Sequence, residues 1–378
     1  MTNSAEDPIP ENSGPEGTSE NQADEPIAPE LKFTGQAYND LHQRAAPELL
    51  AQILQPGSVR DELMDKHPLT IDQQLLITPT MNALFRRAAK AIKFRLKGLA
   101  AFGPPGMGKT CGVTGLSLML AKAYPNIPVF DVIALPHDDF TEKTLWIDII
   151  PKGKKTRNTS AKEIFRDLVA LMAAAAQAAR SQMVILIIDE AQHWRISEWR
   201  YLKGLTNILG KANGDNVRLL TISLGQSSLH TQILNLKNEP DDGEDLRIRF
   251  FDNPHAFSGF ENAAGLHFVL GQLDSAEFTE FPDGSGVCYT EFFAPEAYAA
   301  GWRIATEAER MWLHLCEHVP GTQSISAAVV FKALRQFLWN AAEEDGIGFR
   351  GDDRRWGLAI KGWDLDDEAE AKGQERGQ

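Results

Sequence analysis

The stretch Gly103-Pro-Pro-Gly-Met-Gly-Lys-Thr110 is a complete G-x-x-x-x-G-K-[ST] phosphate loop. It follows the apolar run 98–102 and leads into a stretch of helical character, 111–124. Glycines let such a loop turn tightly, so that its backbone N–H groups and the positive end of the next helix form a nest for phosphates. The strand–loop–helix context therefore predicts a nucleotide site with an α/β fold.

Each polar residue of this loop has an expected role. We expect Lys109 to reach the β- and γ-phosphate oxygens as a point charge, and the Thr110 hydroxyl to join the Mg²⁺ shell. The expected nucleotide-binding residues are Gly103, Pro104, Pro105, Gly106, Met107, Gly108, Lys109, Thr110, Cys111 and Asp189.

A second motif, Met183-Val-Ile-Leu-Ile-Ile-Asp-Glu190, supports this prediction. Its apolar residues do not alternate with polar ones, which is typical of a parallel strand covered on both faces. The strand ends in two carboxylates, at the edge where open α/β sheets bind ligands. Asp189 suits the Mg²⁺ shell with Thr110, and Glu190 suits a base that orients the attacking water. The two motifs together predict binding and hydrolysis of ATP with Mg²⁺.

The amino-acid composition also indicates in which compartment the protein functions. The 378 residues include no stretch near the roughly 20 apolar residues that cross a bilayer, and the acidic N-terminus does not resemble a secretory signal. We therefore expect a cytoplasmic protein without a membrane partner. The three cysteines, Cys111, Cys288 and Cys316, show neither metal-site spacing nor a disulfide framework, and we expect them to be small buried residues.

The net charge of −14 is concentrated at the two ends. Residues 1–31 carry eight acids and no base, and residues 364–378 carry six acids and two bases. The segment 1–31 is also rich in Pro, Glu, Ser and Asn, a composition typical of disorder. The rest of the chain is therefore close to neutral, and the overall acidity does not exclude a nucleic-acid partner.

The pattern along the chain predicts four parts: a disordered acidic tail at 1–35, an α/β nucleotide-binding domain with a helical lead-in at 36–255, a mainly helical lid at 256–363 and an acidic tail at 364–378. In the α/β part we expect strands at 99–102, 128–135, 183–188 and 217–224, and a helix over 76–96 with Thr78 as N-cap. Residues 136–160 are expected to be rich in loops.

The order of these motifs resembles the AAA+ ATPases, which have a parallel sheet flanked by helices and a C-terminal helical lid. The stretch Ile187-Ile-Asp-Glu-Ala-Gln-His193 resembles more narrowly the TniB/TnsC-type regulators of DNA transposition. The lead-in Leu76-Ile-Thr-Pro79 ahead of the phosphate loop also looks like that family. The resemblance covers about residues 72–255 and, weakly, the lid to 343.

The resemblance implies further site residues. A polar sensor is expected at the end of the strand 217–224, with Ser223 and Thr221 as first candidates and Gln226 behind them. An arginine acting on the site of a neighbouring subunit is expected at Arg249 or Arg247, which on a strand would share a face. The lid shows no clear Gly-x-Arg sensor, and Arg303 or Arg335 could substitute for it.

The segment Lys152-Gly-Lys-Lys-Thr-Arg157 places four cations where phosphates could be neutralised without base reading. With the resemblance, Lys152, Lys154, Lys155 and Arg157 are expected to contact duplex DNA, and Trp199 and Arg200 could touch DNA or a neighbouring subunit.

The first hypothesis is an ATP-dependent regulator of transposition that oligomerises on DNA as a ring or helical filament and links a target selector to the transposase. The second is an AAA+ switch in secretion or defence without a DNA partner. A P-loop kinase is a third, disfavoured because the Asp-Glu pair favours water as the nucleophile.

Overall fold

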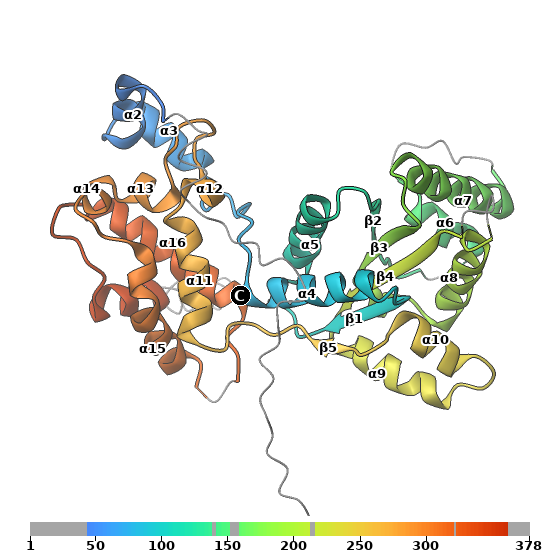
Figure 1. The fold of residues 1–378 in the computed structure, drawn as a ribbon. Coiled ribbons are helices and arrows are strands. Elements are labelled where there is room, and N and C mark those ends of the chain that lie inside the picture. The colour runs from blue at the N-terminus through green and yellow to red at the C-terminus, as the bar shows by residue number, and fades with distance from the viewer. Residues whose placement is uncertain (1–43, 138–140, 152–158, 212–215, 321–322, 362–378) are drawn as a thin grey trace, which may run out of the picture.

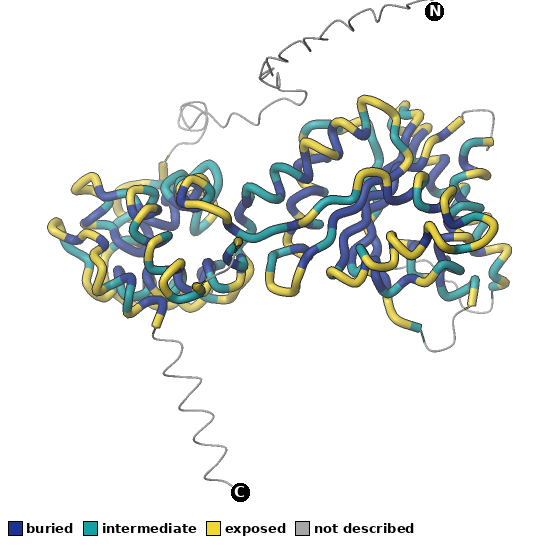
Figure 2. The backbone as a smooth tube through the Cα atoms, turned by 90° about the horizontal axis from the view of Figure 1, so that it is seen from below, coloured by how far each residue is buried: buried dark blue, intermediate teal, exposed yellow. Residues whose placement is uncertain are grey.

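The computed structural model describes residues 44–137, 141–151, 159–211, 216–320 and 323–361. These residues form two lobes that are connected near the start of α4 (Figures 1 and 2). The predictions for the two acidic tails and for the basic segment 152–157 lie outside the described residues. No helix within these ranges is long and apolar enough to span a membrane.

The first lobe is built on a parallel sheet of five strands in the order β2-β3-β4-β1-β5. Its strands are β1 (Gly98–Phe102), β2 (Val129–Ile133), β3 (Met183–Asp189), β4 (Arg218–Gly225) and β5 (His255–Ala256). The four predicted strands are therefore present, close to their expected bounds. All seven residues of β3 are buried, as its unbroken apolar run predicts.

Helices cover both faces of this sheet (Figure 1). Successive residues of β3 point to opposite faces, so Ile185 and Ile187 join one core cluster while Leu186 and Ile188 join the other. The first cluster includes α4 (Pro79–Lys93) and α5 (Lys109–Ala123); the second includes α6 (Glu142–Ile149), α7 (Ala161–Ala178), α8 (Ile196–Leu209), α9 (Ser227–Asn235) and α10 (Gly243–Phe250). Short 3₁₀ turns η1 (Ala191–His193) and η3 (Leu236–Asn238) follow β3 and α9.

The start of α4 follows the sequence prediction. The Thr78 hydroxyl accepts a hydrogen bond of 3.2 Å from the Met81 N–H, and Pro79 occupies the first helical position. The apolar stripe that includes Leu84, Phe85 and Ala88 is buried against the sheet.

The second lobe is helical and has its own core. It contains α2 (Pro47–Leu54), α3 (Ser58–Lys66), α11 (Ala263–Leu273), α12 (Ala276–Thr279), α13 (Tyr289–Phe293), α14 (Pro295–Ala299), η4 (Ile304–Glu307), α15 (Ala308–His318) and α16 (Ala327–Glu343). Residues 353–361 are also helical. We expected the lead-in 36–75 to belong to the α/β domain. The structure corrects this, because Ile53 and Leu69 are buried in the same cluster as α11 and α16.

The segment around Arg247 and Arg249 also differs from expectation. On a strand the two arginines would share a face, but residues 243–250 form the helix α10. Leu246 and Phe250 lie one helical turn apart, and both are fully buried. Acids in the first turn and arginines in the last turn suit the helix dipole and form ion pairs within the helix. The helical period therefore buries the apolar residues together and brings the charged residues into ion pairs.

Two smaller expectations are corrected. The region 136–160 is less irregular than predicted because it contains α6, which the Thr141 capping box starts. Of the three cysteines only Cys288 is buried, while Cys111 and Cys316 are exposed.

Candidate nucleotide-binding and hydrolytic site

The phosphate loop joins β1 to α5, and its glycines occupy positions that other residues would strain. Gly106 and Gly108 have φ of +77° and +86°, and Gly108 is the N-cap of α5. A Cβ on Gly103 would lie only 2.3 Å from the carbonyl oxygen of Phe257. The loop therefore passes under the segment after β5 and ends at the positive end of a 15-residue helix.

Lys109 is the first residue of α5, and its ammonium group lies inside the loop. Its Nζ donates hydrogen bonds to the carbonyl oxygens of Gly103 (3.0 Å) and Pro104 (2.7 Å). Burial lowers the pKa of Lys109, while the nearby carboxylates of Glu190 and Asp189 oppose that shift. The side chain is therefore a desolvated cation beside two acids, a suitable environment for a phosphate group.

Asp189 is the last residue of β3 and is almost fully buried. Burial raises the pKa of Asp189, while the Glu190 N–H (2.9 Å) and the Thr110 hydroxyl oppose the shift by donating to its carboxylate. Thr110 and Asp189 thus bring a hydroxyl and a carboxylate oxygen together at the start of α5. Hard oxygen donors of this kind fit Mg²⁺, which takes one or two carboxylates plus phosphate oxygens.

Glu190 begins the turn after β3 in a left-handed conformation, with φ of +53°. The Gln192 amide donates to its Oε2 at 2.5 Å, and the Gln226 amide makes a weaker contact of 3.5 Å with the same oxygen. The carbonyl end of the Gln192 side chain accepts the Gln226 backbone N–H at 2.9 Å. The Gln192 side chain therefore connects the Glu190 carboxylate to the backbone at the end of β4.

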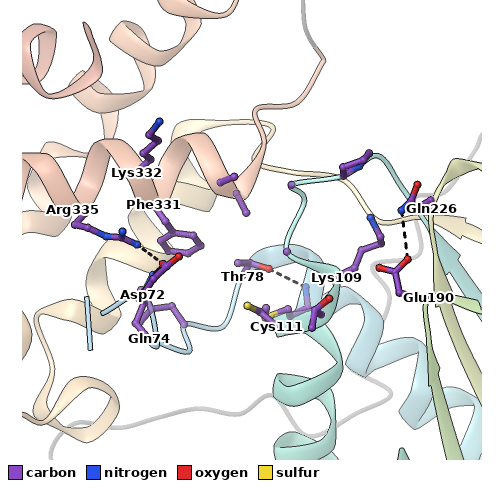
Figure 3. Close-up of a pocket in the computed structure, with 18 residues that line it drawn as sticks. Asp72, Gln74, Thr78, Lys109, Cys111, Glu190, Gln226, Phe331, Lys332 and Arg335 are labelled. Atoms are coloured by element: carbon purple, nitrogen blue, oxygen red, sulfur yellow. Dashed lines mark hydrogen bonds and ion pairs between the residues drawn. The ribbon is translucent and has the colours of Figure 1, made fainter. Parts of the chain in front are cut away.

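The three sensor candidates lie at different places relative to the cavity, and which of them acts as a sensor stays a prediction. β4 extends to Gly225, so Ser223 lies within the sheet opposite Ala100, and its fully buried hydroxyl has no hydrogen-bond partner among the described residues. Thr221 lies two residues further back and contacts the Lys97 carbonyl at 3.4 Å. Gln226, the first residue after β4, lies at the site instead (Figure 3).

Lys109, Thr110, Glu190 and Gln226 line one end of a cavity of about 630 Å³ between the two lobes. Figure 3 shows the loop, Glu190 and Gln226 at one side and residues of α16 at the other. The lining residues are Asp72, Gln74, Leu76, Thr78, Met81, Pro105, Gly106, Gly108, Lys109, Thr110, Cys111, Glu190, Gln226, Ala327, Ala328, Phe331, Lys332 and Arg335. Of the α16 residues that line the cavity, only Arg335 was considered from the sequence.

The start of α16 contacts the phosphate loop directly. The Ala328 N–H donates to the Gly106 carbonyl at 3.0 Å, and Ser326 caps the helix through the Val329 N–H. Further along α16, Arg335 forms an ion pair with Asp72 at the cavity wall. Of the two lid arginines that we considered, Arg335 therefore reaches the cavity.

Arg303 lies elsewhere. Its guanidinium group stacks on the Tyr298 ring at 3.5 Å and donates to backbone carbonyls of the helical lobe. It is not among the residues that line the cavity.

Arg247 and Arg249 do not reach the cavity of their own chain. Arg249 donates to the side chains of Thr206 (3.0 Å) and Asn207 (2.9 Å) on α8, and Arg247 pairs with Glu244. The backbone of α10 near Arg249 packs against Gly98, at the start of β1, whereas the phosphate loop follows its end. A role for either arginine in hydrolysis would therefore require a neighbouring subunit.

The other residues considered for DNA are also placed. Trp199 is only 2% exposed and packs edge-on against Trp194 and Phe251, so it is a core residue. Arg200 is exposed and pairs with Asp242. Lys152, Lys154, Lys155 and Arg157 lie outside the described residues, and their DNA contact remains a prediction.

Comparisons with known proteins agree with this geometry. Residues 96–233 match the family described as AAA domain. No curated protein matches the chain. Among solved structures, the ORC2 protein of Aeropyrum pernix in ADPNP–ADP complexes is similar with a TM-score of 0.51 and 15% identity, over 75% of this chain and 69% of that chain.

Two further structures have lower scores. The A. pernix ORC1 protein in complex with DNA gives a TM-score of 0.42 at 17% identity, over 77% of this chain and 67% of that chain. Domain III of the Thermotoga maritima replication initiation protein DnaA gives 0.40 at 13% identity, over 78% and 96%. At these identities the ORC2 similarity shows a shared fold.

The fold and the site together define a P-loop ATP hydrolase of the AAA+ fold, with ATP and Mg²⁺ as its cofactors. The helices after the α/β lobe are the lid-like part of that fold, and they contribute one wall of the nucleotide cavity.

Proposed function

We propose that this protein is an ATP-dependent DNA-binding regulator of transposition, which oligomerises on duplex DNA and links target selection to the transposase. The main support for regulation by ATP is the cavity that the two lobes share. A nucleotide bound there would touch the phosphate loop and α16 at once, so its hydrolysis would change the contacts between the lobes.

The transposition part is supported by the sequence Asp189-Glu-Ala-Gln192 and its resemblance to TniB/TnsC-type regulators. The DNA part is supported by the four cations of 152–157. In this proposal Lys109 binds the β- and γ-phosphates, and Thr110 and Asp189 hold Mg²⁺. Glu190 orients the attacking water, Gln226 serves as the sensor, and Arg249 or Arg247 completes the site of the next subunit.

The test uses Glu190→Gln, which keeps the size of the side chain but removes the base. Turnover is expected to fall by about 10² or more, while ATP still binds. In ATP the variant is expected to remain on duplex DNA longer than the wild type, because release follows hydrolysis. Lifetimes on labelled duplex, compared in ATP and ADP, provide the measurement.

Two results would change the proposal. If the wild-type protein shows no ATP-dependent duplex binding at about 100 mM salt, the transposition function fails and an AAA+ switch without a DNA partner becomes the better account. If Glu190→Gln hydrolyses ATP at the wild-type rate, another group orients the water.

A further inference from the structure

A basic surface on α4 and the turn after it has no role in the site described above. We call it the α4 basic face, and its six members are all exposed: Arg86, Arg87, Lys90, Lys93, Arg95 and Lys97. None of them forms an ion pair with any residue that the structure describes. Exposed cations elsewhere, such as Lys66 and Arg200, do pair with acids. The chain has 52 acids and 38 bases, yet these six cations within twelve residues have no acidic partner in the described part of the chain.

The folding of α4 does not require these charges. The helix is held by its opposite face, where Leu84, Phe85 and Ala88 are buried. Cations in the last helical turn favour the dipole, but only Lys90 and Lys93 lie there.

The backbone conformation of Arg95 is a second reason to conclude that folding does not require these charges. The N–H groups of Arg95 and Leu96 donate to the carbonyls of Ile92 (3.2 Å) and Ala91 (2.9 Å), which is the Schellman pattern. Arg95 therefore occupies the left-handed position of that motif, with φ of +55°, where glycine is usually favoured. Arg95 therefore places a charged side chain at a position where glycine would be less strained.

The chemistry of this face indicates its partner. Arg86, Lys90 and Lys93 follow one another on α4 at intervals of four and three residues and span about 10 Å of helix. Arg95 and Lys97 lie in the turn after the helix. Duplex DNA carries one negative charge per roughly 1.7 Å of axis, so several phosphates lie within that length. All six members are lysine or arginine, the residue types that neutralise phosphates. Phosphate contacts of this kind position a protein on DNA and carry no sequence information directly.

An anionic membrane is the other large surface with many phosphates. A helix that binds in a membrane interface needs an exposed apolar face. The apolar face of α4 is buried, and Phe94, 56% exposed, is the large apolar side chain beside these cations. The charges therefore fit a polyanion in water better than a lipid interface.

We propose that the α4 basic face binds the phosphate backbone of duplex DNA without reading its sequence. The inference rests on the proposed DNA-binding function and adds a described surface to it. The same helix begins at the nucleotide cavity, which Thr78 and Met81 line. DNA bound on α4 would therefore rest on an element that contacts the bound nucleotide.

The experiment compares two full-length variants with the same charge change. The first is Arg86→Gln/Lys90→Gln/Lys93→Gln. The matched control is Lys162→Gln/Arg166→Gln/Lys211→Gln, which removes three exposed cations from α7 and the turn after α8. Each is titrated with two unrelated duplexes in ATP over a range of salt.

For the α4 triple variant, the slope of log K against log salt is expected to flatten by up to about 2.7, equally for both duplexes. Affinity is expected to fall at least about tenfold near 100 mM salt. ATP affinity and the thermal midpoint are expected to match the control. A second variant, Lys90→Arg/Lys93→Arg, keeps the charge and is expected to bind DNA like the wild type.

The outcomes separate this inference from the proposed function. If the wild type binds neither duplex, the DNA function itself fails; binding to phosphatidylserine vesicles instead would identify a membrane partner. If the wild type binds DNA and the α4 triple variant shows the same affinity and slope as the control, only this inference fails. The segment 152–157 would then be the next candidate.

Discussion

At the scale of single residues, the arrangement around Glu190 is the most informative. Gln192 uses both ends of its side chain, one on the Glu190 carboxylate and the other on the backbone at the end of β4. The backbone carbonyl oxygen of Gln192 accepts a hydrogen bond of 2.7 Å from the Gln232 side-chain amide on α9. The hydrogen bonds to the carboxylate all go to Oε2, so no described residue holds Oε1, which can accept a proton from water.

Gln192→Met tests this arrangement because methionine keeps the length of the side chain but has no amide. Turnover is expected to fall by about tenfold or more, because the base loses its orientation. ATP affinity is expected to stay unchanged, since Gln192 does not line the cavity. Steady-state kinetics with ATP titration provide the measurement, and Gln336→Met, at an exposed position on α16, is the matched control. Wild-type turnover in Gln192→Met would show that Glu190 needs no such support.

At the scale of elements, the segment between α3 and α4 connects the two lobes, and His67 anchors it. The imidazole is fully buried among Phe281, Tyr289, Phe292 and Phe293, with ring centroids 4.3–5.0 Å away. Its Nδ1 accepts the Leu69 N–H at 3.1 Å, which requires an unprotonated Nδ1. Burial lowers the pKa of His67 to about 3.

This burial predicts acid sensitivity of the helical lobe. Between the unfolded pKa of about 6.5 and the folded pKa of about 3, the unfolded chain binds a proton that the folded chain excludes. His67 therefore makes the free energy of unfolding fall as the pH is lowered through that window. In His67→Leu the difference in stability between pH values of about 7 and 4.5 is expected to be smaller, as measured by urea unfolding. His267→Gln, at an exposed site on α11, is the control; equal pH dependence in His67→Leu and the wild type would contradict the prediction.

At the scale of the whole molecule, the described part of one chain forms a nucleotide cavity that neither Arg247 nor Arg249 lines. Arg335 reaches the cavity only where it pairs with Asp72, and Arg247 and Arg249 lie on α10. An oligomer would bring α10 of one subunit to the cavity of the next, as proposed for a ring or filament.

Mixing variants tests that assembly. Arg249→Ala or Arg247→Ala is expected to abolish hydrolysis while ATP affinity is nearly kept, because the finger acts on the transition state. Adding Lys109→Ala subunits is expected to restore part of the turnover, since some interfaces then join an intact loop to an intact arginine. Lys109→Ala mixed with Lys109→Ala/Arg249→Ala is the control, because no intact loop is present. Lack of rescue for both arginines would mean that the site is complete within one chain.

The sequence by itself determined those features whose physics is local. The phosphate loop, the apolar strand before Asp189 and the Thr78 cap depend on residues within a few positions of one another, so their pattern predicts their structure. The parallel sheet and the ATP and Mg²⁺ chemistry follow from these motifs.

Only the tertiary structure decided which residues complete the site. Asp72 and Arg335 are 263 positions apart and meet because the lead-in packs on the helical lobe. β4 runs two residues further than Ser223, so Ser223 lies inside the sheet while Gln226 lines the cavity. Arg249 lies on a helix because Leu246 and Phe250 are buried together. Such choices depend on burial and on contacts between distant segments, which no local pattern contains.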